Sequence, residues 1–256
     1  MNYFNPKSAA ERYSKGRPDF HSNTIKHIKE YLHLDKKLDN VLDVACGTGL
    51  SSKALLEISV NVYGTDISQE MLKLALLPDK IKYALAPAEM QPFPDKTFDL
   101  ITVSSGVHWF DIDKFLAEAN RLLKSKSWLI LYENHFIAEM IGHDNFSSWY
   151  PNVYIKKFPS PQRNNSYSWT NENLISRSFA FLGEEVFKNT VDFTKEELAL
   201  YFTTQSNIIS AVEKKLTTFE DAENWLLQEL TPFFDGADST RIINYGNWIK
   251  YIQKAN

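Results

Sequence analysis

The residues best suited to chemistry are grouped in one short turn. Residues 41–49 read VLDVACGTG, so Gly47 and Gly49 directly follow an apolar run. Glycine tolerates positive φ and lets the backbone approach a ligand closely. A helix that starts at such a turn presents free N–H groups at its positive end. We therefore expect this turn to bind the phosphates of a dinucleotide, or the ribose and carboxylate of another nucleotide-like cofactor.

Asp66 supports this interpretation. It follows Gly47 by 19 residues and ends a second apolar run. In nucleotide-binding sheets, an acidic residue about 20 residues beyond the glycines accepts hydrogen bonds from the ribose hydroxyls. The nicotinamide fingerprint also needs a third glycine, and Ser52 stands at that position. A nicotinamide dinucleotide is therefore not the expected cofactor.

The elements that must position these residues alternate between strand and helix. We predict strands at 39–45, 60–65, 81–85, 98–104 and 128–132, and helices at 22–34, 50–58, 68–77 and 113–124. This alternation predicts βαβ units and a parallel sheet.

After residue 134 the pattern changes. Residues 135–180 are rich in Asn, Ser, Pro and aromatic residues, which predicts a lid or an irregular insertion. Beyond it we predict a strand at 184–193, helices at 194–215 and 219–230, and a final strand pair or hairpin arm at 240–254. Thr194 and Glu197 match a capping box. The chain is predicted to be one domain, with a cofactor-binding half at 1–134, the lid at 135–180 and C-terminal strands with inserted helices at 181–256.

Composition excludes several classes of protein. The 256 residues are 43% hydrophobic and 23% charged with a net charge of −4, so we expect a folded chain with no nucleic-acid partner. No Cys/His cluster has metal-ligand spacing, so no metal is expected. The single cysteine, Cys46, is read as a packing residue and excludes an internal disulfide. No secretory signal or membrane-length apolar run is evident, so we expect a cytoplasmic protein without membrane attachment.

The segment Asp43–Gly49 resembles motif I of the class I S-adenosylmethionine-dependent methyltransferases. Residues 65–72 and 86–100 are similar to the family motifs of the second to fourth strands. Residues 107–111 (VHWFD), with Arg12-Tyr13 and Arg17-Pro18, resemble the trans-aconitate methyltransferase-like subgroup of the small-molecule branch. The resemblance covers roughly residues 8–133.

Two positions depart from the family pattern. Ser125-Lys126-Ser127 replaces a Pro-Gly-Gly turn, and Pro87 stands where many relatives have an acidic residue. A side-chain hydrogen bond to the adenine amine is therefore not expected at Pro87. The backbone N–H of Ala88 or Glu89 is expected to read the adenine edge instead.

The resemblance implies a Rossmann-like α/β fold. Its mostly parallel seven-stranded sheet would carry helices on both faces and a helical or irregular C-terminal cover. S-adenosylmethionine is the implied cofactor. The implied cofactor-binding residues are Tyr13, Arg17, Asp43, Ala45, Gly47, Gly49, Asp66, Ile67, Ala88, Glu89, Ser104, Ser105 and His108. Asp43 is expected to hold the N–H groups of the glycine turn or, through water, the methionine ammonium. Tyr13 and Arg17 are expected to cover the cofactor.

The implied activity is methyl transfer to a small-molecule acceptor, with a carboxylic acid as one candidate. This in-line displacement needs alignment and a desolvated site, and it needs a base only when the nucleophile carries a proton. His108 is the candidate catalytic residue, as a base or a substrate-orienting group. The alternative is a non-catalytic S-adenosylmethionine-binding protein that retains the fold. We expect a monomer or weak homodimer.

The acceptor side is predicted from residues outside these motifs. Arg163, Arg177 and Arg241 are candidates to clamp an acceptor carboxylate, and Glu133 and His135 are further site candidates. Of the 35 aromatic residues, 23 follow residue 127. Four of them are expected to line a mainly apolar acceptor pocket: Phe136, Trp149, Tyr150 and Trp169.

Overall fold

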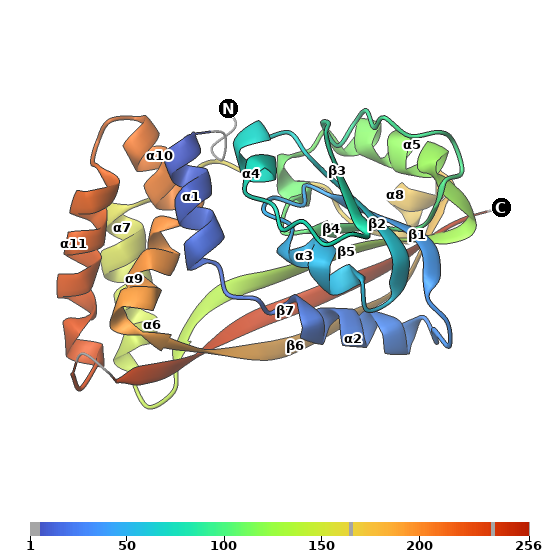
Figure 1. The fold of residues 1–256 in the computed structure, drawn as a ribbon. Coiled ribbons are helices and arrows are strands. Elements are labelled where there is room, and N and C mark those ends of the chain that lie inside the picture. Colours follow the sequence, from blue (N-terminus) through green and yellow to red (C-terminus); the bar gives the residue numbers. More distant parts are fainter. Residues whose placement is uncertain (1–5, 164–165, 237–238, 256) are drawn as a thin grey trace. The chain divides into compact units, whose positions relative to one another are not determined.

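A computed structural model describes residues 6–163, 166–236 and 239–255 (Figure 1). The strands are β1 Leu38–Val44, β2 Ser59–Asp66, β3 Ile81–Leu85, β4 Phe98–Ser104, β5 Leu123–Met140, β6 Phe179–Thr194 and β7 Thr240–Lys254. The α-helices are α1 Lys7–Gly16, α2 His21–Tyr31, α3 Leu50–Leu55, α4 Gln69–Lys73, α5 Ile112–Leu122, α6 Asn145–Trp149, α7 Ile155–Lys157, α8 Asn171–Ile175, α9 Lys195–Thr203, α10 Ser206–Glu213 and α11 Phe219–Leu230. Short 3-10 helices span Val107–Trp109 and Thr231–Phe233, and a π-helix spans Tyr150–Tyr154.

The strands form one seven-stranded sheet in the order β3-β2-β1-β4-β5-β7-β6. The pairs β3–β2, β2–β1, β1–β4 and β4–β5 are parallel. The register pairs Val44 of β1 with Thr65 of β2 and with Val103 of β4, so these three strands end side by side. Ligands of open parallel sheets bind outside such carboxyl ends. The predicted Rossmann-like α/β fold with a mostly parallel seven-stranded sheet is confirmed.

The chain divides into two compact units. The sheet unit comprises residues 19–134, 163–187 and 247–256, and the helical unit comprises residues 1–18, 135–162 and 188–246. The first contains α2 to α5 and α8, and the second contains α1, α6, α7 and α9 to α11. Strands β5, β6 and β7 each contribute residues to both units.

Two apolar clusters form the core of the sheet unit. Leu42 of β1 belongs to a cluster that includes the buried residues of α5. Its neighbour Val41 belongs to a second cluster, with Ile25 of α2 and Leu55 of α3. Successive side chains of a strand point to opposite faces, so β1 packs against helices on both sides and is fixed in place.

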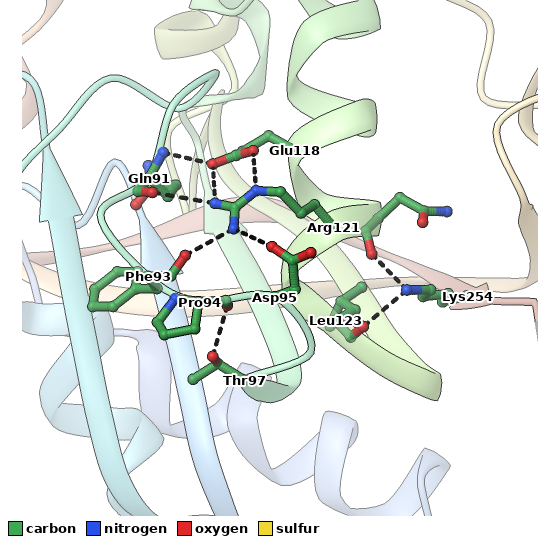
Figure 2. Close-up of polar contacts among 10 residues, drawn as sticks. Gln91, Phe93, Pro94, Asp95, Thr97, Glu118, Arg121, Leu123 and Lys254 are labelled. Atoms are coloured by element: carbon green, nitrogen blue, oxygen red, sulfur yellow. Dashed lines mark hydrogen bonds and ion pairs between the residues drawn. The ribbon is translucent and has the colours of Figure 1, made fainter.

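An ion-pair network holds the segment between β3 and β4. Figure 2 shows the guanidinium of Arg121, on α5, donating to Glu118 and Asp95 at 2.7 Å and to the carbonyl of Phe93 at 2.8 Å. Glu118 also accepts the backbone N–H of Gln91 at 2.7 Å. These bonds fix residues 91–95, which directly follow the segment expected to read the adenine.

The structure corrects several local expectations. The segment 240–254 is one continuous strand rather than a strand pair, because β7 lies between β5 and β6 in the sheet. The helix expected at 68–77 ends at Lys73, and the one expected at 194–215 is divided into α9 and α10. The Thr194–Glu197 capping box is confirmed.

Residues 135–180 are more regular than expected. They contain the end of β5, the helices α6 to α8 and the π-helix. Whether they act as a lid stays a prediction, as does the single-domain organisation. Among the described helices, none is both long and apolar enough to cross a membrane.

Candidate cofactor-binding site

The turn after β1 has an unusual backbone. Ala45, Gly47 and Gly49 have φ of 58°, 56° and 80°, in the left-handed region that side chains with a Cβ rarely adopt. For Ala45 this conformation costs on the order of 1 kcal/mol. Backbone strain of this kind collects at ligand-binding sites. The turn is therefore built for more than a connection between β1 and α3.

Asp66 joins this turn to the end of β2. Its Oδ2 accepts the backbone N–H of Gly47 at 2.9 Å, and its Oδ1 accepts the N–H of Ser68 at 2.7 Å. A carboxylate oxygen has two lone pairs, so each oxygen can accept a further hydrogen bond. Burial raises the pKa of Asp66, and the backbone N–H donors at Ser68 and Gly47 oppose this shift.

Asp43 lies beneath the turn with no exposed surface. Its carboxylate accepts the hydroxyls of Ser51 and Ser52 at 2.6 Å and that of Thr102 at 3.2 Å. Burial raises its pKa to about 6, although the three hydroxyl donors work in the opposite direction. Asp43 thus anchors the first turn of α3 to strands β1 and β4.

The expectation that Asp43 holds the N–H groups of the glycine turn is wrong. The N–H of Gly47 is donated to Asp66, and that of Gly49 to the carbonyl of Cys46. The Asp43 carboxylate instead accepts the hydroxyls of Ser51 and Ser52, on α3, and of Thr102, on β4. Its second expected role, a water-mediated contact to the methionine ammonium, stays a prediction.

Tyr83 is a component of the site region that the sequence motifs did not reveal. Its phenol oxygen lies where a Cβ on Gly49 would be placed, and its ring lies 2.6 Å from a Cβ placed on Gly64. The absence of a side chain at Gly49 and at Gly64 therefore makes space for the Tyr83 ring. At Gly49 it also allows the positive φ of the turn. Tyr83 belongs to β3, which has no glycine or acidic signal of its own.

The end of β4 supplies a second strained turn. Ser104 is the last residue of β4, and Ser105 has φ of 54° and is exposed. A Cβ on Gly106 would lie 2.9 Å from the Cβ of Ala45. The β1 and β4 turns therefore approach each other closely at the carboxyl edge of the sheet, where the sequence predicts Ser104 and Ser105 to contact the cofactor.

His108 follows this turn in a 3-10 helix. Burial is the main cause that lowers its pKa to about 4, and the positive charge of Arg163 adds to the effect. The Arg163 guanidinium also lies 5.9 Å from the ring centre of Trp109. His108 is therefore a neutral imidazole near neutral pH, able to accept a proton or a hydrogen bond.

The remaining predicted cofactor residues of the sheet unit lie in two places. Ile67, directly after Asp66, has 60% of its side chain exposed. Ala88 is buried in the segment after β3, and Glu89 accepts the backbone N–H of Asp111 at 2.8 Å. An apolar side chain is thus exposed beside Asp66. Glu89 is hydrogen-bonded to the backbone at the start of α5.

Tyr13 and Arg17 belong to the helical unit. Within this unit the Arg17 guanidinium lies 4.7 Å from the ring centre of Tyr13. Their expected role as a cover over the cofactor stays a prediction.

The predicted acceptor residues divide between the units. Arg177 pairs with Asp113, and Arg241 pairs with Asp235 at 2.6 Å, so both guanidinium groups are engaged with carboxylates of this chain. Glu133 and His135 stay predictions as acceptor contacts.

The four predicted pocket aromatics are not all in one cluster. Phe136, Trp149 and Tyr150 contact a common ring, Phe202, in the helical unit. Trp169 instead packs against Tyr167 and the core of the sheet unit. Among the described residues no group of three or more acidic, histidine or cysteine side chains is arranged to hold a metal ion.

Comparisons with known proteins agree with this geometry. Residues 42–131 match the family model of a methyltransferase domain. A ubiquinone/menaquinone biosynthesis C-methyltransferase of Rickettsia bellii is 35% identical over 46% of this chain and 53% of the relative. A candidate methyltransferase of Dictyostelium discoideum is 31% identical over 49% of this chain and 47% of the relative. The chain thus spans about half the length of these curated relatives.

A solved structure has the same fold over nearly the whole chain. A candidate type II methyltransferase of Anaeromyxobacter dehalogenans superposes with a TM-score of 0.73 at 17% identity, covering 92% of this chain and 97% of that one. The matched segment 42–131 contains the glycine turn, Asp66 and the β4 turn.

Proposed function

Because the chain belongs to the class I S-adenosylmethionine-dependent methyltransferases, we propose that it transfers a methyl group from S-adenosylmethionine to a small-molecule acceptor such as a carboxylic acid. The observation that carries this proposal is the half-buried carboxylate of Asp66 bonded to Gly47 in the strained turn after β1. A turn that only connected β1 to α3 would need neither the positive φ of Ala45 nor a distant carboxylate.

The residues of the site fit this cofactor. The lone pairs left on both oxygens of Asp66 suit the two ribose hydroxyls. The exposed side chain of Ile67 offers an apolar face for the adenine ring. Gly47 has no side chain, so that a ligand can approach the backbone of the turn there, whereas the space beside Gly49 is taken by the Tyr83 hydroxyl. The cofactor supplies an electrophilic methyl group on a sulfonium when it is bound.

The protein contributes alignment and exclusion of water rather than covalent chemistry. Ala45 and Gly106 bring the β1 and β4 turns into close contact and so fix the edge of the site. A rigid, preorganised edge supports in-line attack because the reacting atoms must be held near contact distance. The anchoring of α3 through Asp43 contributes to the same rigidity.

The state of His108 supports a role with an acceptor that carries a proton. As a neutral imidazole it can orient the acceptor by accepting a hydrogen bond from its hydroxyl, and a pKa of about 4 makes it a weak base. An acceptor carbon, of the kind named for the rickettsial relative, would need a base to take its proton. A carboxylate acceptor would not, and Arg163 beside His108 would then favour its negative charge.

Two measurements test the proposal. Calorimetry should detect binding of S-adenosylmethionine and S-adenosylhomocysteine, and Asp66→Ala should weaken it. Radiolabelled methyl transfer to a panel of carboxylic acids, phenols and quinone precursors should then identify an acceptor. Absence of cofactor binding by the wild-type chain would refute the proposal.

The alternative of a non-catalytic S-adenosylmethionine-binding protein makes a different prediction. It requires binding of both forms of the cofactor without label transfer to any member of the panel. A single labelled product that disappears in Asp66→Ala excludes this alternative.

A further inference from the structure

Arg17 lacks the carboxylate partner that four other arginines of the described chain have. Arg12, Arg121, Arg177 and Arg241 each contact a carboxylate of this chain. In the described residues Arg17 has no such partner, and its side chain donates one hydrogen bond, to the carbonyl of Thr204 at 3.1 Å. Its Nε is buried, and no residue of the described ranges accepts a hydrogen bond from it. A guanidinium has five N–H donors, so most of its capacity is unused.

Tyrosines surround this cation instead of acids. The guanidinium carbon lies 4.7 Å from the ring centre of Tyr13 and 5.2 Å from that of Tyr201. Tyr154 also acts on the charge of Arg17, and no described residue forms a hydrogen bond with the buried hydroxyl of Tyr154. Ring faces attract a cation, but they do not satisfy N–H donors, and a buried donor without a partner is costly.

The position of Arg17 is set by close packing within the helical unit. Arg17 follows α1, and a Cβ on the preceding Gly16 would lie 2.8 Å from the Thr204 side chain and 3.0 Å from that of Leu200. The absence of a side chain at Gly16 therefore lets the end of α1 lie against α9. This contact holds the guanidinium among the tyrosines.

We propose that Arg17, with the hydroxyl of Tyr154, forms a binding site for the carboxylate of an aromatic or apolar organic acid. A carboxylate matches the planar fork of a guanidinium and would accept its unused N–H groups. Tyr154 is a suitable second donor because burial raises its pKa and keeps the phenol protonated. The rings of Phe202 and Trp149, which contact Tyr154, give the surroundings an apolar character.

The charge of the site distinguishes this ligand from the methionine end of the cofactor. A methionine carboxylate carries an ammonium on the adjacent carbon, which a guanidinium repels and which calls for an acidic neighbour. The described groups that act on the charge of Arg17 are all tyrosines. A simple acid without an adjacent cation is therefore the better match. The proposal rests on the proposed function, which names a carboxylic acid as an acceptor, and adds the residues that would bind its carboxylate; binding of an acid is measured separately from methyl transfer.

The test uses phenylacetate as the probe and phenylacetamide as its uncharged counterpart, both titrated into the full chain by calorimetry. We expect the wild type to bind phenylacetate roughly tenfold or more tightly than the amide, and Arg17→Gln to remove this preference. The matched control is Arg12→Gln. Arg12 lies on the same helix but is paired with Glu223 at 2.7 Å, so this variant should keep the preference. Equal binding of acid and amide by the wild type overturns the proposal.

Two further measurements keep the test decisive. Tyr154→Phe removes only a hydroxyl that has no hydrogen-bond partner among the described residues, so it should fold and bind phenylacetate several-fold more weakly. The second measurement is the affinity of Arg17→Gln for S-adenosylhomocysteine, because the family resemblance implies a cofactor contact for Arg17. If Arg17→Gln weakens S-adenosylhomocysteine and leaves phenylacetate unchanged, the carboxylate is that of the cofactor and the proposal is wrong. Failure of the proposed function would appear separately, as loss of S-adenosylhomocysteine binding by the wild type.

Discussion

The carboxylate of Asp66 accepts the backbone N–H of Gly47 at 2.9 Å, across 19 residues of chain. This bond joins the end of β2 to the turn after β1, and it uses one lone pair of one carboxylate oxygen. Asp66 therefore shapes the turn in addition to its proposed contact with the ribose.

From this dual role we expect Asp66→Ala to lose about 1–3 kcal/mol of binding free energy for S-adenosylhomocysteine, measured by calorimetry. Asp66→Asn should lose less, because it keeps one acceptor oxygen. The control is Asp99→Asn, near the opposite end of the sheet, where Asp99 pairs with Lys124. Unchanged affinity in Asp66→Ala would remove this residue from the site.

The pKa of Asp43 leads to a pH dependence of stability. Burial raises this pKa from 3.8 to about 6, so the folded chain holds the proton more tightly than the unfolded chain does. The stability that Asp43 contributes is fully present below pH 3.8 and is lost as the pH rises through about 6. The full effect is about 3 kcal/mol at most.

Asp43→Asn removes this titration. We expect the stability of the variant relative to wild type to improve between pH 4 and pH 7, as measured by urea unfolding at both values. Asp66 is present in both proteins, so its own titration cancels in the difference except for its charge coupling to Asp43. A difference that does not change with pH would show that Asp43 is not the titrating group.

The low pKa of His108 can be measured directly by nuclear magnetic resonance. We expect the imidazole to titrate near pH 4, because burial and Arg163 both disfavour its cation. The stability linked to this shift is present above pH 6.5 and is lost as the pH falls through about 4. Arg163→Gln should raise the midpoint, whereas Arg177→Gln, whose guanidinium is paired with Asp113, should not. A wild-type midpoint near 6.5 would contradict the assignment.

Gly49 and Tyr83 should be coupled in a double-mutant cycle. Gly49→Ala should destabilise the fold by at least about 1–2 kcal/mol, because φ there is 80° and the new Cβ would overlap the Tyr83 hydroxyl. Tyr83→Phe alone should change stability by less than about 1 kcal/mol, since no described residue lies within hydrogen-bond geometry of this hydroxyl and Ser52 interacts with it only weakly. Adding Tyr83→Phe to Gly49→Ala should recover part of the loss, and simple additivity would refute the overlap.

The Arg121 network should contribute more to the free energy of unfolding than to the affinity for the cofactor. Arg121→Gln leaves Asp95 and the Phe93 carbonyl without their donor (Figure 2). We expect a loss of about 1–3 kcal/mol in urea unfolding, with little change in S-adenosylhomocysteine affinity. A large loss of affinity would instead make the segment 91–95 part of the binding site.

Much of the sheet unit was predictable because its signals are local. The apolar runs predict the parallel strands, since buried strands need no alternation. Gly47 and Gly49 mark the turn because few other residues tolerate its φ values. The distance to Asp66 follows from one helix and one strand of ordinary length. Element ends were predicted less well, as in α4 and α10.

The partners of buried polar groups were not predictable in the same way. The sequence marks Asp43 as unusual, but its bonds to Ser51, Ser52 and Thr102 depend on α3 and β4 folding against β1. Tyr83 has no motif of its own and matters only because Gly49 and Gly64 lie beside it.

The sequence by itself determined the strand–turn–helix that holds the glycines, the acidic residue at the end of the next strand, and the parallel sheet that brings them together. These features rest on short-range geometry and on the periodicity of apolar residues. Tertiary structure decided which carboxylate bonds to the turn, which arginines are neutralised, and which cation is left among tyrosines. Such pairings depend on side chains far apart in the sequence, and only the packing of helices and strands brings them within hydrogen-bonding distance.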